Sequence, residues 1–145
     1  MIDKREKFMD QALAMSEMRL KQFQLLKEYT LNHCELLDED GYPTHYALAL
    51  VSGWTWEDPV GFMEFVKSLW WAPDWGWRES VVDHDFRFGE KVRRYDISTG
   101  GWSGNESLIR AMEKTDMLWH QIWVQSRRGG HYIFQIRSEE HTSEL

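Results

Sequence analysis

Three glycines within five positions, Gly100, Gly101 and Gly104, are the feature that most constrains the fold of this chain. Residues 92–98 precede them and have the pattern of a strand, and residues 106–114 follow them with the pattern of a helix. Glycine adopts positive φ at little cost and lets the backbone approach another group closely. The segment therefore predicts a tight turn that leads from a strand directly into a helix.

The start of that helix has the spacing of a capping box. The Ser103 hydroxyl is placed to accept from the Glu106 N–H, and the Glu106 carboxylate to reach back to Ser103. A glycine turn that ends on free N–H groups at a helix N-terminus suits an anion or a phosphate. The same segment also turns a corner without any ligand, so both interpretations stay open.

Length, charge and cysteine content narrow the class of protein. A chain of 145 residues suits a single domain with its own core, and nine tryptophans predict a rigid fold with aromatic surface. A net charge of −7 argues against general nucleic-acid binding, which needs a basic face. Cys34 is the single cysteine, so neither an internal disulfide nor a cysteine-based zinc site is expected. The absence of a long apolar run predicts a soluble cytoplasmic protein with no membrane partner.

Residues 1–37 are expected to form a long amphipathic helix, because residues 3–36 are rich in helix formers and contain no glycine or proline. The helix either packs on the domain or extends from it as an oligomerisation helix. Gln22 and Asn32 interrupt a strict heptad, which weakens the second interpretation. A homo-oligomer formed through this helix stays an alternative.

Two short helices and a tryptophan cluster follow. Thr44 is a candidate N-cap for a helix over residues 46–52, and Asp58 followed by Pro59 is a typical helix start. Four tryptophans then occur within residues 70–77. Such a cluster packs in a core, or forms a wall on which a base or ring stacks.

The second half of the chain predicts a sheet. Strand patterns occur at residues 78–88, 91–98, 117–125 and 131–136. With Gly129 and Gly130 as a two-residue hairpin loop, Arg128 would pair with His131, and Arg127 with the residue after it. The expected fold is α+β, with a three- to four-stranded antiparallel sheet and packed helices over residues 38–136, preceded by the long N-terminal helix.

The candidate site combines the glycine loop with the hairpin turn. If the strand at 91–98 neighbours the C-terminal hairpin, the two segments meet at one end of the sheet, and arginine there gives bidentate contacts to an anion. The alternative is that the arginines are solvated and Trp102 only packs. The predicted ligand-binding residues are Thr99, Gly100, Gly101, Trp102, Ser103, Gly104, Asn105, Glu106, Arg127, Arg128 and His131.

Enzymatic interpretations have less support. The chain has no nucleophile elbow, no H-E-x-x-H motif and no P-loop lysine. Glu106 with His131 or His120 is the candidate acid/base pair of a phosphoesterase, although His120 in an apolar run is typical of a core histidine. A non-enzymatic binding protein for a small anionic or nucleotide-like ligand is therefore favoured, with no metal and no cofactor.

Three motifs carry a resemblance. W-G-W-R at 75–78, S-T-G-G-W-S-G-N-E at 98–106 and R-R-G-G-H-Y at 127–132 resemble motifs of small uncharacterised proteins encoded by bacteriophages and prophages. The resemblance implies the cytoplasm of a bacterial host and a role against host defence. It also supports an alternative function, in which the chain is an inhibitor or adaptor of a host protein and uses its N-terminal helix and tryptophan-rich surface.

Residues 137–145 resemble the translation of a common sequencing-adapter oligonucleotide. They have no apolar pattern, so a disordered tail is expected. No function is assigned to them.

Overall fold

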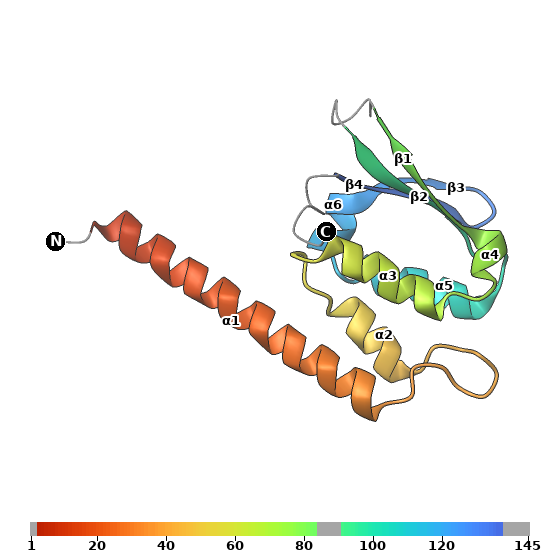
Figure 1. The fold of residues 1–145 in the computed structure, drawn as a ribbon, viewed down its shortest axis with the longest axis horizontal. Helices are drawn as coiled ribbons and strands as arrows, with labels where there is room; N and C mark the ends of the chain where they lie inside the picture. Colours follow the sequence, from red (N-terminus) through yellow and green to blue (C-terminus); the bar gives the residue numbers. More distant parts are fainter. Residues whose placement is uncertain (1–2, 84–90, 138–145) are drawn as a thin grey trace.

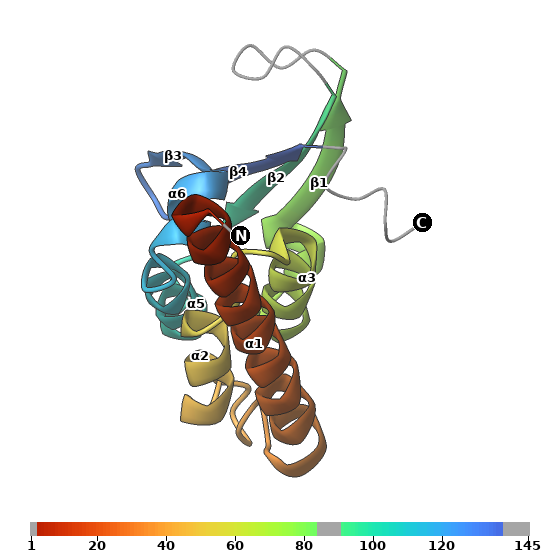
Figure 2. The same cartoon turned by 90° about the vertical axis from the view of Figure 1, so that its left-hand side faces the viewer.

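A computed structural model describes residues 3–83 and 91–137. Helices lie on one side of a four-stranded antiparallel sheet, and one long helix extends from the body (Figures 1 and 2). This confirms the α+β class and the N-terminal helix. Among the described residues, no helix has both the length and the hydropathy that a membrane crossing requires.

Helix α1 (Lys4–His33) is continuous because nothing in its sequence breaks it. Asp3 is its N-cap and accepts a hydrogen bond from the Arg5 N–H. Only Phe23 and Thr30 are buried along its 30 residues, and both lie in its second half. The first half projects away from the rest of the molecule (Figure 1).

Five shorter helices follow: α2 (His45–Ser52), α3 (Pro59–Leu69), α4 (Pro73–Gly76), α5 (Ser103–Glu113) and α6 (Met117–Ile122). The two predicted N-caps are confirmed. The Thr44 hydroxyl accepts from the Ala47 N–H, and the Asp58 carboxylate accepts from the Gly61 N–H. These caps fix where α2 and α3 begin, and so how they meet the sheet.

The sheet has the order β1-β2-β4-β3, and each neighbouring pair is antiparallel. Its strands are β1 (Trp77–Val82), β2 (Val92–Ser98), β3 (Trp123–Arg127) and β4 (His131–Arg137). The strands predicted at 78–88 and 91–98 are present as the antiparallel pair β1 and β2, while the end of the first predicted strand, from residue 84, lies outside the described residues. Arg137 ends β4, so the expectation of disorder is wrong there, and residues 138–145 lie outside the description.

The core lies between the helices and one face of the sheet. Tyr95, Ile97 and Phe134 point into it from the two central strands, and all three are almost completely buried. The tryptophan cluster is divided. Trp70 and Trp77 are buried in the core, whereas Trp71 and Trp75 are exposed. Alternate residues of each strand face the other side of the sheet.

The predicted strand over residues 117–125 is wrong in its first part. Met117–Ile122 forms helix α6, and β3 begins only at Trp123. Leu118 and Ile122 are both buried. Residues four positions apart lie on the same face of a helix and also on the same face of a strand, so this spacing does not distinguish the two. His120 is exposed on this helix, with Nδ1 2.8 Å from the Asp116 carbonyl oxygen, so it is not a core histidine.

The predicted register of the last hairpin is also wrong. Arg127 pairs with His131, which makes a three-residue loop of Arg128, Gly129 and Gly130. Both glycines have positive φ, at 85° and 77°. A shift of one residue moves a side chain to the other face of a sheet. The observed register therefore places Arg127 beside His131 on one face.

Candidate functional site

The glycine loop and the hairpin turn do meet. Strand β2 pairs with β4, and the Thr99 N–H donates to the Gly130 carbonyl oxygen at 2.9 Å. A Cβ on Gly130 would lie 2.3 Å from Thr99 Oγ1, so a larger residue there would force the Thr99 side chain or the turn to move. The arrangement expected for a site at this end of the sheet is therefore present.

The N-terminus of α5 is covered by aromatic side chains. Its N-cap is Trp102, which makes no side-chain capping bond, so the predicted capping box is wrong. The Trp102 ring lies directly on Gly104, where a Cβ would overlap it, and stacks on Tyr42 with ring centroids 4.6 Å apart. The Ser103 hydroxyl donates to the Tyr42 hydroxyl at 3.4 Å. These contacts give the segment a packing role.

Asn105 holds the loop together from inside. Its side chain is 1% exposed and accepts from the Trp71 N–H at 2.8 Å. Its amide donates to the carbonyl oxygens of Trp71 and Thr99. A buried amide with three hydrogen bonds is satisfied without a ligand. Glu106 lies in the first turn of α5, within the helix layer.

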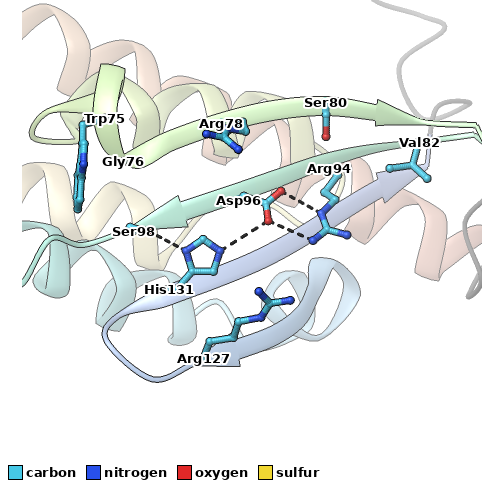
Figure 3. A pocket seen from close by; sticks show the side chains of 10 residues that line it. All are labelled: Trp75, Gly76, Arg78, Ser80, Val82, Arg94, Asp96, Ser98, Arg127 and His131. Carbon is cyan, nitrogen blue, oxygen red and sulfur yellow. Dashed lines mark hydrogen bonds and ion pairs between the residues drawn. The ribbon is translucent and has the colours of Figure 1, made fainter.

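A hollow of about 620 Å³ lies on the face of the sheet opposite the core (Figure 3). All four strands contribute to it, together with the end of α4. Its lining residues are Trp75, Gly76, Arg78, Ser80, Val82, Arg94, Asp96, Ser98, Arg127 and His131. Volumes of about 300–1,000 Å³ are typical of small-molecule sites.

The hollow is basic although the chain as a whole is acidic. Three arginines, Arg78, Arg94 and Arg127, face one aspartate, Asp96, which leaves a formal charge of +2 before His131 is counted. Arg94 donates to both oxygens of Asp96, at 3.0 and 3.2 Å. Within the described part of the chain, neither Arg78 nor Arg127 has a carboxylate within ion-pair distance.

Asp96 is held in its charged form. Burial alone would raise the pKa of this carboxyl, but hydrogen bonds and attraction from Arg94, with a smaller contribution from His131, hold the pKa below its usual value. His131 Nε2 is 3.7 Å from an Asp96 oxygen, and its Nδ1 is 2.7 Å from Ser98 Oγ. The imidazole is therefore oriented from both sides (Figure 3).

Trp75 forms one end of the hollow and is 70% exposed. Its ring lies against Gly100, where a Cβ would come within 3.0 Å of it. Gly100 has a φ of +65°, which glycine adopts at little cost, and its lack of a Cβ leaves room for the Trp75 ring. The glycine loop thus supports an exposed aromatic ring at the edge of a basic hollow.

The structure brings only part of the predicted set together. Arg127 and His131 line the hollow, and Gly100 supports its aromatic end. Arg128 is exposed on the hairpin turn and does not line the hollow. Of the other predicted residues, Trp102, Ser103, Gly104 and Asn105 make the packing contacts described above, while Thr99, Gly101 and Glu106 belong to the loop and the first turn of α5.

Sequence reasoning missed the contributions of β1 and β2. Arg78 and Ser80 are two positions apart on β1. Arg94, Asp96 and Ser98 likewise occupy every second position of β2. That period of two was a usable signal, because it puts polar groups on one face of each strand. What the sequence lacked was the strand order that places these faces side by side.

Comparisons of the chain with protein-family models, with curated proteins and with solved structures found no match. The role of the hollow therefore has to be inferred from the chemistry of its lining residues. Guanidinium groups give bidentate hydrogen bonds to phosphate and carboxylate, and an exposed indole offers a stacking surface. The combination suits an anion that carries a flat ring.

Proposed function

We propose that this protein binds a small anionic or nucleotide-like molecule in the hollow on the open face of its sheet. The observation that carries the proposal is the pair Arg78 and Arg127, which reach the hollow from the two edge strands with no carboxylate partner among the described residues. Each guanidinium offers an anion charge-assisted hydrogen-bond donors that no described carboxylate already occupies.

The proposed pose follows from the lining residues. A phosphate or carboxylate lies between Arg78 and Arg127, while His131 stays bonded to Ser98 and directed at Asp96. A base or other ring stacks on Trp75 at the end of the hollow. Arg94 is already paired with Asp96, so it contributes less to ligand charge.

The test is calorimetric titration of the full chain with inorganic phosphate, sulfate, nucleoside mono- and triphosphates and cyclic nucleotides. Charge-assisted hydrogen bonds contribute roughly 1.5–3 kcal/mol each, so the double variant Arg78→Gln/Arg127→Gln should weaken binding by about a hundredfold or more. The matched control is Arg128→Gln, which removes a neighbouring arginine that does not line the hollow. Binding lost equally in the control, or no binding of any compound, would overturn the proposal.

The bacteriophage resemblance, the role against host defence and the bacterial cytoplasm remain predictions. They rest on the three motifs, of which W-G-W-R contributes Trp75, Gly76 and Arg78 to the hollow, and R-R-G-G-H-Y contributes Arg127 and His131. Under this proposal those five residues line the ligand site, and the calorimetric test of the Arg78→Gln/Arg127→Gln variant examines two of them.

A further inference from the structure

Most of the large apolar side chains of helix α1 are exposed to solvent. Eight large apolar side chains on it are between 54% and 69% exposed, and six of them follow one face of the helix: Phe8, Met15, Met18, Leu25, Leu26 and Tyr29. Contiguous exposed apolar surface on this scale marks an interaction site. Since the projecting half of α1 has no buried residue, the domain of the same chain does not cover it (Figure 1).

The helix has two separate contact lines. The line toward its own domain runs through the more buried residues Ser16, Leu20, Phe23, Lys27 and Thr30. At 100° per residue, the exposed apolar line lies about 120° around the helix from it. Both lines can therefore be occupied at once, one by the domain and the other by a partner.

The exposed line has the spacing of a helix-pairing seam. Its residues follow one another by alternating steps of three and four, which is the a/d pattern of a heptad. The seam residues are Phe8, Gln11, Met15, Met18, Gln22 and Leu25. All six are exposed, so the seam is available as it stands.

We propose that α1 pairs with α1 of a second copy of this chain in an antiparallel homodimer. In one antiparallel register, Met15 faces Met18 of the second copy and Phe8 faces Leu25 of the second copy. The same register sets Gln11 against Gln22 of the second copy. Gln11 and Gln22 of the second copy then hydrogen-bond to each other, and the four apolar seam residues face only apolar ones.

Charges beside the seam select this orientation. In the antiparallel register, Lys7 flanks the seam opposite Glu28 of the second copy, and symmetry makes the pair twice. In a parallel pair, Lys7 would face Ala12 of the second copy, and Glu28 would face His33 of the second copy. Only the antiparallel dimer therefore gains lysine–glutamate pairs.

The seam lies at the small end of the size range for a specific interface. Aromatic side chains bury on the order of 150–250 Å² each and the aliphatic seam residues less, so the six seam residues of each copy, partly buried, cover on the order of 1,000 Å² in total. Stable specific interfaces begin near ~1,200 Å² in total, so we expect a dimer of moderate affinity.

The test is analytical ultracentrifugation of the full chain over a wide range of concentration. The wild-type chain should form a dimer. Met18→Glu, which places like charges in the seam, should raise the dimer dissociation constant by about a hundredfold or more. The matched control is Gln24→Glu, on the exposed face away from both contact lines, and it should leave the constant unchanged.

Charge reversal tests the orientation. Lys7→Glu alone and Glu28→Lys alone should each weaken the dimer by about three- to tenfold, and the double variant should restore it, because residues 7 and 28 of one helix are too far apart to touch. A chain that stays monomeric, a dimer that ignores Met18→Glu, or a double variant without rescue would overturn the proposal. A monomer that binds anionic lipid vesicles through α1 would assign the seam to a bilayer.

Discussion

At the scale of single residues, the position of a side chain along a strand decides its role. Arg93 and Arg94 are neighbours of the same chemistry, yet Arg94 faces the hollow and Arg93 lies beside Tyr95 on the core side. Alternation along β2 causes this separation. The alternation is visible in the sequence. Which of the two faces packs in the core is shown only by the burial of Tyr95 and Ile97.

Tyr95 gives a prediction at this scale. It is 1% exposed, and burial raises its pKa to about 12, although Arg93 nearby lowers it in part. The folded state therefore holds the neutral phenol more firmly than the unfolded chain, whose tyrosine has a pKa near 10.0. This stabilisation is complete below pH 10 and is lost as the pH rises toward 12. The loss should be about 2–3 kcal/mol in the free energy of unfolding.

Urea unfolding at pH 9 and near pH 12 would measure this loss. Tyr95→Phe should have a smaller loss than the wild-type chain over that range, because no phenol ionises at this position. Tyr46→Phe is the control, since Tyr46 is 48% exposed and the same substitution there removes no phenol from the core. Equal alkaline losses in the wild-type chain and in Tyr95→Phe would refute the assignment.

At the scale of elements, the N-caps of α2 and α3 are predictable from local sequence, whereas the start of α5 and the arrangement of the elements are not. Thr44 and Asp58 predicted the starts of α2 and α3, because a cap depends on residues a few positions away. The predicted strand over residues 117–125 is wrong for Met117–Ile122, because the apolar residues there fit a strand and a helix equally well. Helix α6 packs against β4, and this tertiary contact cannot be predicted from the sequence of the segment alone.

The last hairpin offers a matched pair of substitutions. Gly129 and Gly130 both have positive φ, so alanine at either position should cost about 1 kcal/mol of backbone strain. At Gly129 nothing lies within 4 Å of an added Cβ, whereas at Gly130 the Cβ would meet Thr99 Oγ1. Gly130→Ala should therefore lower the free energy of unfolding clearly more than Gly129→Ala does. Equal effects in chemical denaturation would mean that the loop and the turn are not in contact.

At the scale of the whole molecule, the chain separates three surfaces. One face of the sheet carries the core, the other carries the basic hollow, and α1 projects an apolar seam. The fold class is predictable from the sequence, because the patterns of most helices and strands are visible in it. The hollow did not, because it needs the order β1-β2-β4-β3, which brings Arg78 and Arg127 from the two edge strands to one site.

The central claim is that an anion binds in this hollow, and it is tested most directly by nuclear magnetic resonance. The full chain, isotope-labelled, would be titrated with ATP while the arginine Nε–H and tryptophan indole N–H resonances are followed. We predict saturable shifts for Arg78, Arg127 and Trp75, with Arg128 and Trp102 unmoved. Shifts confined to Arg128 and Trp102, or no saturable shift in any of these resonances, would contradict the account.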